Sequence, residues 1–213
     1  MNVAILTSPN QWFIEYAIIL QNKIKGSKLF FQHEDINNNF DLIFILSYHK
    51  IIPQDYLKKS KHNIVIHASK LPSGKGWAPM FWQILEGKKE IPFTMFEISS
   101  GVDDGDIYMQ KYLNLTGYEL NEELRKKQAY FIVDMCLEFL NNYDKYKSPT
   151  KQVGIESFYS KRTKEDSKLD INKTINEQFN LLRIVNNNDY PAFFYKEGKK
   201  YILKIEEAND EDR

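Results

Sequence analysis

The stretch Val65–Gln110, VIHASKLPSGKGWAPMFWQILEGKKEIPFTMFEISSGVDDGDIYMQ, holds the features that decide the fold. An apolar run ends at His67 and is followed by a loop rich in Gly, Pro and Lys. The spacing of apolar residues in 77–85 then predicts a helix, and the alternation in 92–98 and 107–115 predicts two strands. The stretch therefore predicts a strand that exits into a glycine loop, then a helix, then a return to strands.

The residues before this stretch extend the same pattern. Residues 11–25 carry apolar side chains at helical spacing, and short apolar runs predict buried strands at 3–7, 29–31, 42–47 and 63–66. Strands that alternate with helices predict an open α/β fold with a Rossmann-like, mostly parallel sheet. The longest predicted helix covers 121–143, and its apolar stripe includes Cys136.

A polar segment divides the chain. Residues 141–152 are rich in Lys, Tyr and Asn and mark the end of the sheet domain. We therefore expect a main domain over residues 1–143 and a small C-terminal module over residues 144–213. Within that module the sequence predicts one helix and the two strands of a β-hairpin, at 172–186, 192–195 and 200–205.

The composition excludes several classes of function. The 213 residues include 29 Lys and Arg against 29 Asp and Glu, so the chain has no basic excess that would favour nucleic acid, although a local basic patch stays open. One cysteine cannot form an internal disulfide, which favours a reducing, cytoplasmic setting. The N-terminal residues lack the features of a signal peptide, and no uncharged apolar run is long enough to predict a membrane span.

Common cofactor motifs are also missing. The first strand is followed by TSPNQW rather than by G-x-G-x-x-G, so we expect no dinucleotide there. The acidic cluster at 103–106 lacks the rest of a calcium-binding loop. The histidines do not fall into metal-ligand spacing, and we expect no metal site from His33, His49, His62 and His67.

His67 and the acidic cluster each allow two interpretations. His67 is either an inert, hydrogen-bonded residue at a strand end or a catalytic base, because ligands of open α/β sheets bind at the carboxyl ends of strands. The sequence GVDDGD is either a simple turn or a turn that points one aspartate at the imidazole. The second interpretation needs one inward carboxylate and two solvated ones.

Several motifs in order resemble one family. The segment HASKLPSGKGWAPMFWQILEGKKEIPFTMFEISSGVDDGDI contains His-x-Ser-x-Leu-Pro, a glycine loop with an aromatic-Pro helix start, and Val-Asp-x-Gly-Asp-Ile. Together these resemble the formyltransferases that use N10-formyltetrahydrofolate. The upstream segment FDLIFILSYHKIIPQDYL is similar to the strand and loop that hold the pterin in that family. The resemblance covers residues 40–140.

The resemblance implies roles for individual residues. His67 matches the family's catalytic histidine, and Asp103 matches its aspartate. The family's catalytic asparagine would fall at Val65, so Asn63, two residues earlier on the same strand face, is the candidate replacement. The implied co-substrate is N10-formyltetrahydrofolate, with its pterin held by Tyr48, Ile51, Ile52, Gly101 and Val102.

The C-terminal third resembles sugar-nucleotide N-formyltransferases. The segment KRTKEDSKLDINKTINEQFNLLRIVNNNDYPAFF matches them at Lys161, Arg162, Asp170, Asn180, Arg183, Tyr190, Pro191 and Phe194. The resemblance implies that the acceptor is a nucleotide-linked amino sugar. The best candidate is a UDP-linked 4-amino-4,6-dideoxy sugar of the pseudaminic-acid type. We expect that acceptor to contact Lys75, Gly76, Trp77, Arg162, Asn180, Arg183, Tyr190 and Phe193.

Other acceptors and functions stay open at this point. A C-terminal region too short for the barrel-like domain of the tRNA enzymes, together with zero net charge, argues against a tRNA acceptor. Two alternative functions are a formyltetrahydrofolate hydrolase and a non-catalytic nucleotide-sugar-binding protein. The second is consistent with Val65, which stands where the family has its catalytic asparagine. The aromatic hairpin near 193–201 suggests a homodimer.

Overall fold

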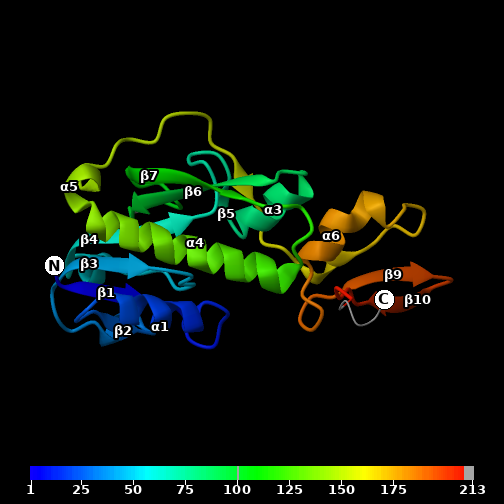
Figure 1. Ribbon diagram of the computed structural model, residues 1–213, viewed down its shortest axis with the longest axis horizontal. Helices are drawn as coiled ribbons and strands as arrows, with labels where there is room; N and C mark the ends of the chain where they lie inside the picture. Colours follow the sequence, from blue (N-terminus) through cyan, green and yellow to red (C-terminus); the bar gives the residue numbers. More distant parts are fainter. Residues whose placement is uncertain (100, 209–213) are drawn as a thin grey trace.

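The computed structural model describes residues 1–99 and 101–208 and contains a six-stranded sheet with the order β2-β1-β3-β4-β6-β7 (Figure 1). Neighbouring strands from β2 to β4 are parallel, whereas β4/β6 and β6/β7 are antiparallel. The strands are β1 Val3–Leu6, β2 Lys28–Phe30, β3 Phe40–Ile45, β4 Ser60–His67, β6 Glu90–Glu97 and β7 Ile107–Asn114. The predicted α/β fold with a mostly parallel sheet is confirmed.

Three helices cover one face of this sheet: α1 (Ile14–Lys23), α3 (Pro79–Leu85) and α4 (Asn121–Asn141). In Figure 1 the long helix α4 crosses in front of the strands. Its buried residues, among them Phe139, join those of α1 and the strands in one apolar cluster. Burying a side chain of this size contributes about 1.5–3 kcal/mol, so this face carries most of the core.

The opposite face has a thinner cover. Two short elements connect the strands here: the 3₁₀ turn His33–Asp35, between β2 and β3, and helix α2 (Gln54–Leu57), between β3 and β4. A second, smaller apolar cluster there contains Leu6, Ile45 and Leu57. Because side chains alternate along a strand, residues 63, 65 and 67 of β4 belong to this face.

The C-terminal elements are α5 Tyr143–Tyr146, β8 Phe158–Tyr159, the 3₁₀ turns Lys164–Ser167 and Asn176–Gln178, α6 Phe179–Ile184, β9 Ala192–Lys196 and β10 Lys199–Leu203. The antiparallel hairpin β9–β10 projects from the rest of the molecule (Figure 1). The helix predicted for 172–186 is too long, because α6 begins only at Phe179. Side chains of Asp170, Thr174 and Gln178 hydrogen-bond nearby backbone groups and hold the preceding residues in turns instead.

The polar segment after α5 stays against the sheet domain. Thr150 forms a backbone bridge with Ile107, and β8 pairs in parallel with β5 (Lys75–Gly76). The division at residue 143 remains a prediction, but residues 157–159 lie against the loop that follows His67. Gly76 permits this pairing, since a Cβ there would lie 2.5 Å from the carbonyl oxygen of Tyr159.

Candidate active site

His67 is the last residue of β4, and the chain beyond it is fixed by buried hydrogen bonds. Gln83 of α3 donates its amide N–H to the carbonyl oxygen of Ala68 (2.7 Å), and the Thr94 hydroxyl donates to that of Ser69 (2.6 Å). His67 Nε2 lies 2.9 Å from the Gly74 carbonyl oxygen and donates its proton to it. A neutral imidazole in this tautomer keeps its lone pair on Nδ1, which is then the basic nitrogen.

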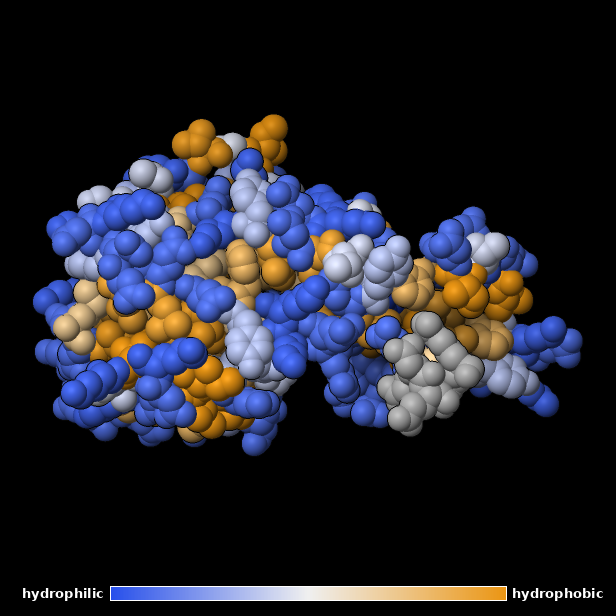
Figure 2. All heavy atoms as spheres, viewed as in Figure 1, coloured by the Kyte–Doolittle hydropathy of each residue, from blue (hydrophilic) through white to orange (hydrophobic). Residues whose placement is uncertain are grey.

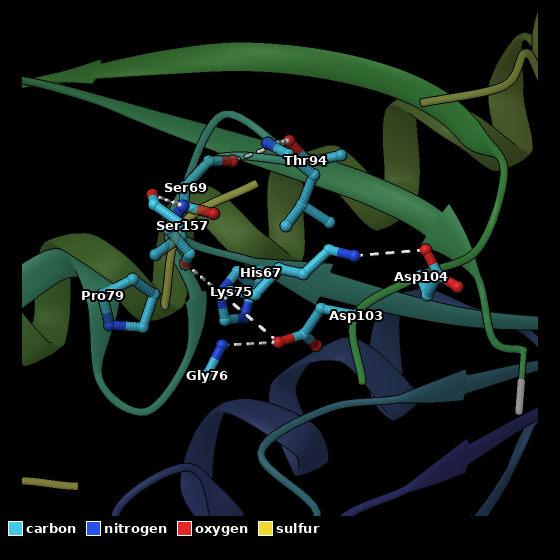
Figure 3. Close-up of polar contacts among 12 residues, drawn as sticks. His67, Ser69, Lys75, Gly76, Pro79, Thr94, Asp103, Asp104 and Ser157 are labelled. Carbon is cyan, nitrogen blue, oxygen red and sulfur yellow. Dashed lines mark hydrogen bonds and ion pairs between the residues drawn. The ribbon is translucent and has the colours of Figure 1, made fainter. Parts of the chain in front are cut away.

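Asp103 reaches the same imidazole from the segment that follows β6. Its Oδ2 lies 3.7 Å from His67 Nε2 and accepts the Gly76 backbone N–H at 2.9 Å (Figure 3). Asp103 has a φ of 48°, a left-handed conformation that Asp tolerates better than most residues. Gln152 stabilises this turn by donating to the carbonyl oxygens of Asp103 and Gly105, both at 2.8 Å.

The two side chains are largely shielded from solvent. The exposed fraction is 10 % for the His67 side chain and 18 % for that of Asp103. In such a setting a carboxylate can stabilise an imidazolium that forms when Nδ1 accepts a proton. The arrangement is therefore suited to general base catalysis on a substrate amine or hydroxyl.

A large cleft opens beside this pair. It has a volume of about 930 Å³ and is bounded by the residues after β1, by the starts of α3 and α4, and by residues 161–190. Three of the residues expected to contact the acceptor line it, namely Trp77, Arg162 and Tyr190. Figure 2 shows the molecule narrowing, with hydrophilic residues on its surface, where the sheet domain meets the C-terminal hairpin. His67 and Asp103 are not among the lining residues; the pair is connected to the cleft through Gly76, which donates to Asp103 and precedes Trp77.

A family model described as formyl transferase matches residues 19–138, more than half of the 213 residues. The chain belongs to the formyl transferase family. A methionyl-tRNA formyltransferase of Thermodesulfovibrio yellowstonii is 28 % identical over 190 residues, which are 86 % of this chain and 60 % of that protein. The chain thus spans less than two thirds of the length of that curated relative.

Solved structures of formyltransferases have the same fold. A methionyl-tRNA formyltransferase from Clostridium thermocellum superposes with a TM-score of 0.80 and 21 % identity. The superposition covers 99 % of this chain and 95 % of the Clostridium chain. A 4-N formyltransferase from Francisella tularensis matches 98 % of both chains, with a TM-score of 0.69 and 17 % identity. At these identities the matches establish the fold and leave the acceptor open.

The residue expected to replace the catalytic asparagine does not reach the site. The Asn63 side chain donates to the Leu57 carbonyl oxygen (2.9 Å) and accepts from the Ser60 hydroxyl (2.9 Å). Four residues of strand span about 13 Å, so Asn63, in the middle of β4, lies far from His67 at its end. The hypothesis that Asn63 supplies a donor beside His67 is therefore wrong, and Val65 leaves that position without a polar side chain.

Lys75 has a different environment from the one predicted. Its side chain is 3 % exposed and its Nζ contacts Glu156 (2.7 Å) and Asp104 (3.1 Å), and Lys75 does not line the cleft (Figure 3). Burial opposes the charged form, but hydrogen bonds to Glu156 and Asp104 raise the pKa of Lys75 above its ordinary value. This charge cluster fixes the glycine loop to the Asp103 turn, a positioning role.

Three further residues expected to bind the acceptor have structural partners instead. Arg183 is 1 % exposed, and its Nη1 lies 3.2 Å from both the carboxylate and the backbone carbonyl of Glu119. Asn180 accepts a hydrogen bond from Arg183 Nε at 3.0 Å. Phe193 is 2 % exposed, with Lys200 Nζ 3.6 Å from its ring centroid. None of the three is among the residues that line the cleft.

Of the residues expected to hold the pterin, two lie on the less covered face of the sheet and three are exposed. Tyr48 and Ile52 pack against the smaller apolar cluster, and the Tyr48 hydroxyl contacts His33 Nδ1 at 2.7 Å. Ile51 and Val102 are 93 % and 65 % exposed, and Gly101 is exposed as well. Contact of these residues with a folate remains a prediction.

Sequence reasoning missed Arg125, whose guanidinium lies in the cleft between Trp12 and Phe81. A signal was available in the composition. The chain has four arginines against 25 lysines, and three of the four belong to described residues with aromatic or carboxylate partners: Arg125, Arg162 and Arg183. In a lysine-rich chain, an arginine marks a place where a planar, multidentate cation is required.

The described residues contain neither a metal-binding cluster nor a membrane-spanning helix. Among residues 1–99 and 101–208, no group of three or more His, Cys, Asp or Glu side chains is arranged to hold a metal ion. No helix in these ranges is long and apolar enough to cross a bilayer. Burial raises the pKa of the Cys136 thiol, which lies in the core of α4.

Proposed function

We propose that this protein transfers the formyl group of N10-formyltetrahydrofolate to the primary amine of a nucleotide-linked amino sugar. The observation that carries the proposal is the His67–Asp103 pair, placed beside a cleft of about 930 Å³ that contains aromatic rings and cations. A nucleotide sugar has a flat base, an anionic diphosphate and a polar sugar, and the cleft offers groups suited to each. A UDP-linked 4-amino-4,6-dideoxy sugar is the specific candidate.

The proposed reaction is a direct acyl transfer. The neutral amine attacks the formyl carbon and forms a C–N bond, which leaves a negative charge on the formyl oxygen. His67 Nδ1 accepts a proton from the amine, and the imidazolium is stabilised by the Asp103 carboxylate. Collapse of the intermediate breaks the bond to N10 of the folate, and N10 takes up a proton. The products are a formamide and tetrahydrofolate.

Methionyl-tRNA is the second candidate acceptor. The names of the Thermodesulfovibrio yellowstonii and Ehrlichia ruminantium relatives favour it, at 28 % and 33 % identity. Both acceptors present a primary amine, so the His67–Asp103 pair serves either one. The balanced charge of the chain, with 29 basic and 29 acidic residues, favours the smaller acceptor.

The deciding experiment supplies N10-formyltetrahydrofolate together with one acceptor at a time. UDP-, dTDP- and GDP-linked amino sugars, methionyl-tRNA and no acceptor form the five arms, each analysed by mass spectrometry. We expect a mass gain of one carbonyl on a nucleotide sugar. A gain on methionyl-tRNA alone, or release of formate without any acceptor, contradicts the proposal.

A further inference from the structure

Three cations converge in the cleft without carboxylate partners. Arg125, Lys161 and Arg162 all line it. The Arg125 hydrogen bond goes to Gln128 Oε1 at 3.3 Å, and Arg162 Nη2 donates to the backbone carbonyl of Asp166 at 3.1 Å. Among the described residues none of the three cations forms an ion pair, and the acidic residues Glu15, Glu122 and Asp189 line other parts of the same cleft.

Their proximity is electrostatically unfavourable in the absence of an anion. Burial, and then the charge of Arg162, lower the pKa of Arg125 to about 10. Burial, opposed by the charge of Asp166, lowers the pKa of Arg162, whose Nε is buried without a hydrogen-bond partner among the described residues. Burial followed by the charges of Lys161 and Arg125 lowers the pKa of His49. Half-buried, like-charged groups of this kind are stabilised when an anion binds between them.

Aromatic rings hold these cations in place. The Arg125 guanidinium carbon lies 4.6 Å from the Trp12 ring centroid and 4.4 Å from that of Phe81. Lys161 Nζ lies 4.7 Å from the centroid of Trp77, a ring that is 48 % exposed. Such stacking orients a guanidinium before a ligand arrives, so less side-chain entropy is lost on binding.

We propose that Arg125, Arg162 and Lys161 form a diphosphate-binding site and that Arg125 is its anchor. Three cations match the two to three negative charges of a diphosphate better than the charge of a single phosphate ester. A sugar attached to that diphosphate lies next to Trp77, which follows the Gly76 that is hydrogen-bonded to Asp103. The identity of the ligand rests on the proposed function, whereas anion binding can be measured without any formyl donor.

Binding is measured by isothermal titration of the full chain with inorganic pyrophosphate, with inorganic phosphate and with UDP. We expect pyrophosphate and UDP to bind and to compete, and phosphate to bind at least tenfold more weakly. Arg125→Gln should weaken pyrophosphate binding about 10–100-fold, the equivalent of one charged hydrogen-bonding group. Lys126→Gln, which removes the same charge from the exposed neighbour on α4, should leave the affinity unchanged.

Each outcome decides the matter. Equal pyrophosphate affinity in Arg125→Gln and Lys126→Gln overturns the proposal, and so does equal affinity of the wild type for phosphate and pyrophosphate. Circular dichroism verifies folding. If Arg125→Gln is unfolded, Arg125→Lys and Arg162→Gln replace it, each with an expected partial loss. Intact pyrophosphate binding without formylation of any nucleotide sugar leaves the anion site standing and refutes the proposed function instead.

Discussion

Strand β4 carries two histidines, and each has a ring nitrogen at the same distance from a carboxylate oxygen. His62, near its start, has Nδ1 3.7 Å from Glu97 Oε2, and His67, at its end, has Nε2 3.7 Å from Asp103 Oδ2. The surroundings differ. His62 contacts the hydroxyls of Tyr108 (2.9 Å) and Tyr143 (2.8 Å) through its two ring nitrogens, so both are satisfied within the protein.

The Glu97 carboxylate is equally well satisfied. It accepts the Tyr108 hydroxyl at 2.5 Å and the Asn63 backbone N–H at 2.6 Å. By contrast, His67 uses Nε2 for Gly74, and Asp103 receives a backbone N–H from a loop that borders the cleft. The comparison shows that a histidine–carboxylate distance does not identify a catalytic pair. Position at the carboxyl end of a strand, where ligands of open α/β sheets bind, is what favours His67 over His62 as the proposed base.

The largest expected effect comes from replacing each histidine in turn. His67→Asn should reduce formyl transfer about 10²–10⁴-fold, the usual contribution of general acid–base catalysis. His62→Gln should leave transfer within a few-fold of wild type and lower the free energy of unfolding by about 1–3 kcal/mol, because tyrosine hydroxyls lose partners. Steady-state kinetics and urea denaturation of both variants measure these effects.

A matched loss of activity in the two histidine variants would contradict the distinction between them. Pyrophosphate affinity serves as the control for the cleft, and it should survive His67→Asn. If affinity disappears together with activity, His67 has a structural role and the catalytic assignment fails.

Replacing the carboxylate partner of each histidine should have a smaller effect on formyl transfer, and it tests the pairing directly. Asp103→Asn should reduce transfer about 10–100-fold, since the imidazolium loses a charged partner worth about 1.5–3 kcal/mol. Asn tolerates the left-handed backbone at position 103 and can still accept the Gly76 N–H, so the turn should persist. Glu97→Gln is the control, with an expected transfer rate near that of wild type. Kinetics of both variants at equal folded fraction decide the question, and equal losses would refute the pairing of His67 with Asp103.

Local sequence patterns predicted the elements that depend on near neighbours. The strand ends, and therefore the placement of His67, follow from apolar runs and the breaks after them. Asn180 and Arg183 are three positions apart in helix α6, and their side chains hydrogen-bond at 3.0 Å. Which face points inward depends on Glu119, 64 positions away in sequence from Arg183, and spacing alone cannot reveal that partner.

Local sequence patterns could not predict the cleft either, because it is also formed by residues that are distant in sequence. Its cations and rings come from four distant segments, represented by Trp12, Phe81, Arg125 and Arg162. Arg162 was expected to contact the acceptor, but nothing near Trp12, Phe81 or Arg125 in the sequence indicates that these residues meet it in one cleft. Asn63 failed for a simpler reason: a strand rises by about 3.3 Å per residue, so four positions separate it from His67 by more than any asparagine can bridge.

The smallest effect is a pH dependence that the His62–Glu97 network should show. Burial, opposed by hydrogen bonds from Tyr108 and the Asn63 backbone, raises the pKa of Glu97 above its ordinary value of 4.5. The folded state therefore binds more protons than the unfolded state above pH 4.5, and stability falls as the pH rises towards the folded pKa.

Glu97→Gln removes this proton, so its unfolding free energy should change less with pH over the range just above 4.5, by at most about 1.4 kcal/mol per pH unit. Urea denaturation at half-unit intervals measures both slopes. Glu138→Gln is a control of opposite sign, because hydrogen bonds from Lys111 and Tyr146 lower the pKa of Glu138. Its contribution is present above the ordinary pKa and is lost on acidification, so removing it should flatten the curve at lower pH. Identical slopes for wild type and Glu97→Gln would mean that Glu97 is solvated like any surface carboxylate, and the contrast between the two ends of β4 would then rest on His67 alone.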